Sequence, residues 1–409
     1  STQAKTLFPY TTLFRSTGQL TAMSNFQLSN LTEDQIAAIE TQDLAALNNA
    51  QLGALQTQQF AAMTSEQVSN LTLKQVAAIP TADLNALGTT LLQAMTTAQV
   101  AVLTANQVSR LNTTNLSALL TEQVQALNLR AVAALTPTQL SNMTTDQTSA
   151  LLTSQVPSVS ASSLAAMTTD QVSTLTNNQV TALVSSQILA LTSNQVQALT
   201  TTQLPALETR DLIHFSASQL NALSSDQVQS LTTTQVSSLT WSQIGNIGGD
   251  QIAALTDAQV ASLTSRQVQY LTASQIGNLS TAQVVAIETT DLAAMTTGQI
   301  VSFSADQIAA ITTAQVATLD ASEVQALGTD IANMGTAALA SLSTGQVGAL
   351  TSDQIAALDA ADAGALTPDQ VAAMSSAQIA ALSTSAFAAL STAALAAISS
   401  SAAAGITSA

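Results

Sequence analysis

The chain has 409 residues, of which 46% are hydrophobic but only 2% aromatic and 8% charged. Its 24 acidic and 7 basic residues give a net charge of −17, which disfavours binding to nucleic acid and to anionic membrane surfaces. Cysteine is absent, which excludes disulfides and thiolate metal sites. Polar residues interrupt every apolar run well before the length that a membrane-spanning helix needs, so no membrane insertion is expected.

The first sixteen residues are treated apart from the rest. Residues 7–16 read as the translation of a common short-read sequencing adapter. We therefore expect residues 1–16 to be a non-native leader in an environmental sequence, and we exclude them from the fold prediction. The native start of the protein, and any signal peptide on it, then lies outside the chain.

An eight-residue pattern, Leu-Thr-x-x-Gln-Val-x-Ala, fills the remainder of the chain. With the glutamine as the marker position, the register runs in steps of eight from Gln19 to Glu323. One residue is then missing, and the register resumes at Asp330 and ends at Ala402, which makes 49 octads. The marker is Gln in 34 octads and Asp in 6. A strict short repeat of this kind predicts a stack of similar units.

The octad carries the signature of a helix start. Ser or Thr stands three residues before the marker in 32 octads. Ser or Thr followed three residues later by Gln is a capping box, in which each side chain bonds the backbone of the other. Proline directly follows the cap in Thr136-Pro137, where a missing N–H costs nothing. Each octad is therefore predicted to begin a new helix at its Ser or Thr.

Two apolar positions follow the marker, one and four residues after it. In one continuous helix they would drift by roughly 80° per octad and would bury no constant face. In a strand, a spacing of three would send the two side chains to opposite faces, whereas in a helix it brings them together. The sequence thus predicts an all-α superhelical solenoid of 49 helical units, each about one and a half to two turns long. A β-solenoid is the alternative. The number of octads per superhelical turn and the handedness stay open.

The register divides the array into three parts. Residues 17–325 form one continuous series, and residues 326–382 continue it after the one-residue slip, where we expect a kink or a tightened turn. Residues 383–409 form a Ser/Ala-rich end without marker glutamines, which we expect to fray.

Three residues, His214, Trp241 and Tyr270, break the pattern in a way that suggests contact with a partner. His214, the one histidine, and Tyr270 occupy a position that is usually small, as does Arg110. Trp241, the one tryptophan, directly follows its cap and is expected to face outward. For each of them the alternative is a tolerated substitution at the edge of a groove. No set of residues suggests catalysis, a cofactor or a metal site, since one imidazole without a paired ligand or nucleophile supplies neither.

Octads such as Leu191-Thr192-Ser193-Asn194-Gln195-Val196-Gln197-Ala198 resemble the low-complexity Leu-Thr-x-x-Gln arrays within very large bacterial secreted or cell-surface proteins. The resemblance covers almost the whole chain. It implies an extracellular stalk, adhesin or matrix role, and it supplies no catalytic residue.

These observations favour a non-enzymatic structural repeat protein that forms a stalk or filament outside a bacterial cell. The expected partners are further copies, associated end to end or laterally, with weak association of cations on the acidic surface. An adhesive or ligand-binding surface is the alternative. A third hypothesis is binding to ice or mineral by the arrayed threonines, although their hydroxyls are predicted to serve as caps.

Overall fold

The computed structural model describes residues 16–404 and 406. The adapter-like segment therefore lies outside the described residues except for Ser16. The chain divides into two compact units, Ser1–Leu207 and Glu208–Ala409. Within the described residues there is no strand, and each of the 49 octads forms one short helix, of which 46 are α-helices and three are 3-10 helices. The all-α solenoid is confirmed, and the β-solenoid is not supported.

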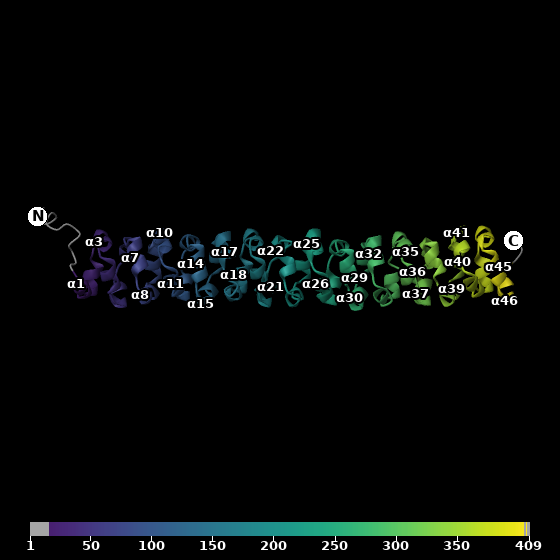
Figure 1. Cartoon of the computed structure of the whole chain (residues 1–409), viewed down its shortest axis with the longest axis horizontal. Helices are drawn as coiled ribbons and strands as arrows, with labels where there is room; N and C mark the ends of the chain where they lie inside the picture. The colour runs from purple at the N-terminus through teal and green to yellow at the C-terminus, as the bar shows by residue number, and fades with distance from the viewer. Residues whose placement is uncertain (1–15, 405, 407–409) are drawn as a thin grey trace. The chain divides into compact units, whose positions relative to one another are not determined.

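In the first unit, which occupies the purple to teal part of Figure 1, the helices follow one another in chain order. Their bounds are α1 Thr17–Thr21, α2 Asn25–Ser29, α3 Glu33–Ala37, α4 Thr41–Ala45, α5 Asn49–Leu52, α6 Thr57–Ala61, α7 Ser65–Asn70, α8 Leu73–Ala78, α9 Thr81–Ala86, α10 Gly88–Gln93, α11 Thr97–Ala101, α12 Ala105–Ser109, α13 Thr113–Ser117, α14 Thr121–Ala126, α15 Leu129–Ala133, α16 Pro137–Asn142, α17 Thr145–Ala150, η2 Val156–Ser158, α18 Ala161–Ala165, α19 Thr169–Ser173, α20 Asn177–Thr181, α21 Ser185–Ala190, α22 Ser193–Ala198 and η3 Leu204–Ala206.

The second unit continues the same succession. Its helices are α23 Thr209–Leu212, α24 Ala217–Asn221, α25 Ser225–Ser230, α26 Thr233–Ser238, α27 Trp241–Asn246, α28 Gly249–Ala253, α29 Asp257–Ala261, α30 Ser265–Gln269, α31 Ala273–Gly277, α32 Thr281–Ala286, α33 Thr289–Leu292, α34 Thr297–Ile300, α35 Ala305–Ala310, α36 Thr313–Val316, α37 Ala321–Ala326, η4 Gly328–Asn333, α38 Thr336–Ala340, α39 Thr344–Gly348, α40 Ser352–Ala357, α41 Ala360–Ala365, α42 Pro368–Ala372, α43 Ser376–Ala381, α44 Thr384–Ala389, α45 Thr392–Ala397 and α46 Ser400–Ala403.

The helices begin where the capping box predicts. At Thr256, for example, the backbone is extended, the hydroxyl accepts a bond from the N–H of Gln259, and the Gln259 side-chain oxygen accepts from the N–H of Thr256. The α-helices are only four to six residues long, at or below the expected length. Helices this short are unstable alone in water, so their stability comes from packing in the stack.

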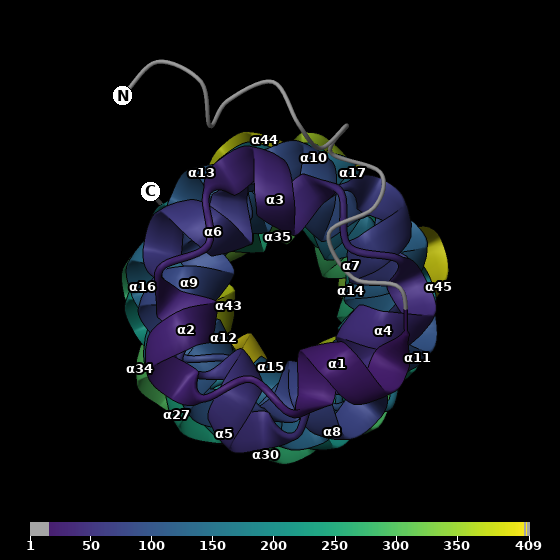
Figure 2. The same cartoon turned by 90° about the vertical axis from the view of Figure 1, so that its left-hand side faces the viewer.

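Each unit winds so that a helix packs on the third helix before it. In the first unit, α1, α2 and α3 lie on successive sides of a ring, and α4 returns beside α1 (Figure 2). The same spacing pairs α29 with α32 and α32 with α35 in the second unit. Backbone carbonyls bonded by the next turn lie 28 and 31 residues earlier, as for Gln75 and Gln107. One superhelical turn therefore takes about three and a half octads.

The two apolar positions of the octad form the core. Val76 and Ile79, one and four residues after the marker Gln75, are 0% and 3% exposed, and the pattern repeats through both units. Thr148 is the polar exception after a marker, and it is buried with its hydroxyl donating to the carbonyls of Thr144 and Thr145. In the second unit, a cavity of about 20 Å³ lies among core residues from Leu220 to Leu255.

The missing residue after Glu323 is absorbed in one tightened connection. Leu327 adopts a helical conformation instead of an extended one, Gly328 has a positive φ of 53°, and the octad forms the 3-10 helix η4. Only there do the bonds of the next turn shift by one residue. Gln346 reaches the carbonyls of Val316 and Leu319, 30 and 27 residues earlier. The spacing returns to 31 and 28 at Gln370, so the slip is local.

The Ser/Ala-rich end corrects one expectation. Instead of fraying, residues 384–403 continue as α44, α45 and α46, whose caps Ser383, Ser391 and Ser399 accept backbone bonds. Alanine at the marker, as at Ala386 and Ala394, is fully buried. Packing against α41 and α42 maintains these helices without a glutamine.

Candidate functional site

The marker glutamine has two roles in the stack, and the sequence predicted only one of them. Its side-chain oxygen accepts the N–H of its own cap, as predicted. The side chain is also buried, and its amide nitrogen donates to backbone carbonyls of the preceding superhelical turn. In Gln59, which is 1% exposed, the nitrogen bonds the carbonyls of Leu28 and Leu31 at 2.9 and 2.7 Å. One amide thus begins a helix and joins two turns.

This inter-turn bond recurs throughout both units. Every marker glutamine from Gln51 to Gln203, and every one from Gln243 to Gln378, donates to a carbonyl 27 to 31 residues earlier. Within the described residues, no buried side-chain nitrogen or oxygen lacks a partner. The polar groups inside the stack are therefore satisfied by the repeat itself.

Aspartate at the marker makes a different inter-turn bond. Asp83 accepts from the Thr57 hydroxyl at 2.8 Å, and Asp291 accepts from the Ser265 hydroxyl at 2.6 Å, each 26 residues earlier. Burial raises the pKa of Asp291 above its ordinary value, and the Ser265 hydroxyl opposes this rise. At these two aspartate markers, a hydroxyl donor one turn away thus replaces the amide donor of glutamine.

The predicted partner-contact residues separate into a pair and a single residue. Trp241 begins α27 and Tyr270 ends α30, and their rings stack with centroids 4.3 Å apart at 33°. Trp241 is 43% exposed and Tyr270 is 40% exposed, so Trp241 faces outward as predicted. The Arg266 guanidinium lies 5.7 Å from the indole centroid and 5.8 Å from the phenol centroid. We call Trp241, Arg266 and Tyr270 the aromatic cluster.

His214 stands apart from the aromatic cluster. His214 is half-buried and follows α23, and its backbone N–H donates to the carbonyl of Asp211. Burial raises the pKa of Asp211, and the Arg210 guanidinium opposes that rise. Arg210 itself pairs with Glu208 at 2.7 Å on the surface. Within the described residues, no group of three His, Cys, Asp or Glu residues is placed to hold a metal ion.

Arg266 was not predicted as a site residue. The signal was the spacing, since Arg266 and Tyr270 follow Trp241 by 25 and 29 residues, close to one superhelical turn. That spacing carries no information until the number of octads per turn is known.

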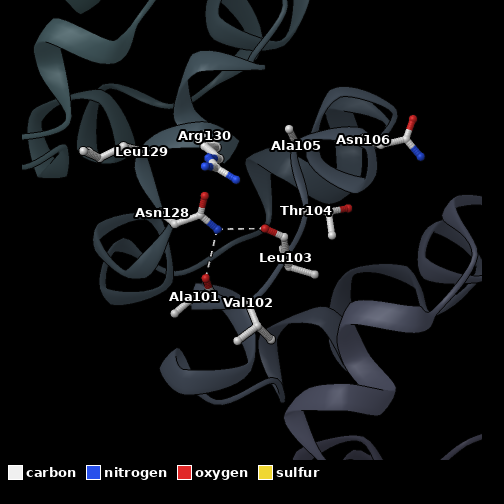
Figure 3. A pocket seen from close by; sticks show the side chains of 9 residues that line it. All are labelled: Ala101, Val102, Leu103, Thr104, Ala105, Asn106, Asn128, Leu129 and Arg130. Carbon is white, nitrogen blue, oxygen red and sulfur yellow. Dashed lines mark hydrogen bonds between the residues drawn. The ribbon is translucent and has the colours of Figure 1, made fainter. Parts of the chain in front are cut away.

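A surface hollow of about 600 Å³ lies in the first unit between the N-terminal ends of α12 and α15. Its lining includes Ala105, Leu129 and Arg130, and Figure 3 shows the Asn128 amide between the carbonyls of Ala101 and Leu103. Those bonds are 2.9 and 2.8 Å long. They provide the inter-turn donor that this octad lacks at its marker, Ala131.

This hollow is a repeat feature and not a unique pocket. A second hollow of about 380 Å³ lies at the equivalent place between α3 and α6. Ala105 and Arg130 occupy the same octad positions as Trp241 and Arg266, so the aromatic cluster fills in the second unit what Ala105 leaves open in the first. The hollow between helix starts thus occurs at two equivalent places of the first unit.

Within the described residues, no helix is long and apolar enough to cross a membrane. Comparison with known families finds the ALTTAQ repeat at seven places, which together cover more than half of the chain. The matched residues are 36–73, 76–113, 204–241, 244–281, 284–321, 324–360 and 355–392. No curated protein matches the chain significantly. The chain belongs to the ALTTAQ repeat family.

Proposed function

We propose that the protein is a non-enzymatic structural element, a stalk or filament-forming solenoid that acts outside a bacterial cell. The observation that carries this proposal is the inter-turn glutamine bond, repeated with the same geometry in both units. Such a bond serves the continuity of the stack and gives no octad a separate task. The acidic surface, with a net charge of −17, keeps such an array soluble.

The same bond supports self-association. A turn without a neighbour presents amide donors and apolar side chains on one face, and carbonyl acceptors and apolar side chains on the other. In the first described turn of the first unit, Gln27 is exposed and Gln35 half-buried, whereas later marker glutamines such as Gln59 and Gln75 are buried. The two kinds of face are complementary, so a second copy can continue the stack end to end.

Electron microscopy of the purified chain over a concentration series tests the filament. We expect particles that lengthen with concentration in steps of one chain length. Gln27 and Gln35 replaced together by Glu should shorten them at neutral pH, because two donors become acceptors on one face. Single chains at every concentration would contradict the filament. The stalk hypothesis would still stand in that case. It is tested separately, by asking whether the native gene product is secreted and anchored to the cell.

A second candidate function is an adhesive surface, and the aromatic cluster is the observation that favours it. Half-exposed Trp241 and Tyr270 beside a guanidinium offer a stacking face with a positive edge, suited to sugar rings or planar anionic groups. Glycan and protein arrays probed with the full chain should show binding that Trp241→Ala abolishes. Val301→Ala, an exposed apolar residue in the same unit, is the matched control. Equal binding by both variants, or none by the native chain, would contradict adhesion by this cluster.

A further inference from the structure

One marker in the described residues is a glutamate, and it occupies the site of an inter-turn glutamine. Glu323 is the third residue of α37, and it is 6% exposed. Its Oε2 accepts the N–H of its cap, Asp320, at 2.7 Å, as the side-chain oxygens of Gln315 and Gln346 do at their own caps. By equivalence with the marker glutamines, its other oxygen, Oε1, corresponds to the amide nitrogen of those side chains.

The groups that this nitrogen would bond are carbonyls. Markers immediately around Glu323 donate to the carbonyls 31 and 28 residues earlier, as Gln315 does to Val284 and Ile287 at 2.8 and 2.9 Å. For Glu323 the equivalent carbonyls belong to Leu292 and Met295, on and just after α33. Within the described part of the chain, no side-chain donor bonds either of them. An ionised Glu323 carboxylate offers these two carbonyls only another acceptor. A protonated carboxyl supplies the donor that they lack.

We propose that Glu323 is a pH-controlled bond between two superhelical turns of the second unit, which forms when the carboxyl is protonated and opens when it ionises. The joint lies directly before the one-residue slip at Gly328. The connection there already departs from the extended backbone of the regular octad.

The charged groups on the elements around Glu323 are all carboxylates. Asp320 caps the same helix, and Asp330 lies on η4, which packs against α37. Asp291 lies on α33, next to Leu292. The other two elements that pack on α37, α34 and α39, contain no charged residue. Burial, and then the nearby Asp320 carboxylate, raise the pKa of Glu323, while the bond from the Asp320 N–H lowers it.

The sign of the pH effect follows from this direction. A carboxyl whose pKa is raised in the folded state contributes stability below its unfolded pKa, and that contribution is lost as pH rises through the folded pKa. The joint is therefore closed in mild acid and weakened at neutral pH.

Hydrogen–deuterium exchange of the full chain, corrected for intrinsic rates, tests the joint at about pH 4, below the unfolded pKa, and at about pH 8. In the native chain, protection of α33 and α37 relative to α31 and α35 should fall about fivefold or more at the higher pH, since a buried acceptor loses its donor. In Glu323→Gln this pH dependence should disappear, and α33 and α37 should remain protected at both pH values. Asp291, Asp320 and Asp330 are present in both proteins, so the difference isolates Glu323.

The converse variant is Gln307→Glu, which places a carboxyl where an amide now bonds Ile276 and Leu279. It should create the same pH dependence at α31 and α35, and circular dichroism would show that the fold persists. Equal pH dependence in the native chain and Glu323→Gln would overturn the proposal. So would pH-independent protection in Gln307→Glu.

Discussion

At the scale of single residues, the marker explains why this chain uses glutamine and not glutamate. Both side chains complete a capping box, since both accept the cap N–H. Only glutamine also carries a donor, and the carbonyls of the preceding turn require one. The marker is Gln in 34 octads and Glu only at position 323. This bias is present in the sequence, and the inter-turn bond accounts for it.

Loss of one such amide should be costly. In Gln139→Met we expect the stack to lose about 2–5 kcal/mol locally, because the carbonyls of Val108 and Leu111 and the N–H of Thr136 lose their partners. Urea unfolding together with hydrogen exchange at α12 and α16 would measure the loss. Gln125→Met, at an exposed position in the same unit, should change stability by less than about 0.5 kcal/mol. A similar effect of both substitutions would refute the inter-turn role.

The carboxylate markers predict a different response. In Ser265→Ala, Asp291 loses the hydroxyl that restrains its pKa, so that pKa should rise further above its ordinary value. Stability near pH 7 should fall by about 1–3 kcal/mol, and by less in acid, where the carboxyl is protonated. Titration of the Asp291 carboxyl by NMR would show the shift. Ser265→Thr, which copies the Thr57–Asp83 pair, should leave it unchanged.

At the scale of one helix, the cap and the stack share the work of stabilisation. A helix of four to six residues has few internal hydrogen bonds, so the bonds made by its N-terminal N–H groups are a large share of its total. Where the cap hydroxyl is missing, as at Glu288, the helix persists because its apolar residues remain buried. The cap therefore sets where a helix begins, and packing decides whether it survives.

Thr256→Ala measures the share of the cap. The variant should lose about 0.5–2 kcal/mol, because the N–H of Gln259 loses the hydroxyl while the glutamine oxygen still holds the cap N–H. Faster amide exchange in α29 would report the opening. Thr256→Ser keeps the oxygen and should behave as the native chain does. If exchange in α29 is the same in all three proteins, the cap has no energetic role.

At the scale of the molecule, each unit is a series of equivalent turns in which contacts reach only neighbouring turns. Stability in such a series is a sum of local terms, and no octad is indispensable. The slip at Gly328 shows that even a missing residue disturbs only the turn above it.

Deletion experiments test this equivalence. Removal of residues 304–311, one whole octad, should preserve the helical spectrum and a cooperative melt close to that of the native chain, because every later marker still meets a carbonyl pair. Removal of residues 304–307, half an octad, joins a connection to the middle of α35 and should destabilise the second unit by several kcal/mol, about the cost of exposing one core pair. Circular dichroism melts distinguish the two. Equal damage from both deletions would contradict independent octads.

The sequence by itself determined the local structure: Ser or Thr starts each helix, the two apolar positions face inward, and each octad is one unit. These features depend on neighbours within eight residues. Only the tertiary structure decided that a turn takes about three and a half octads, that the marker amide crosses between turns, and that Trp241, Arg266 and Tyr270 meet. The physical reason is that the angle between successive short helices is set by packing and by the reach of the glutamine, which act between residues about 28 apart. A periodicity of eight carries no record of that distance.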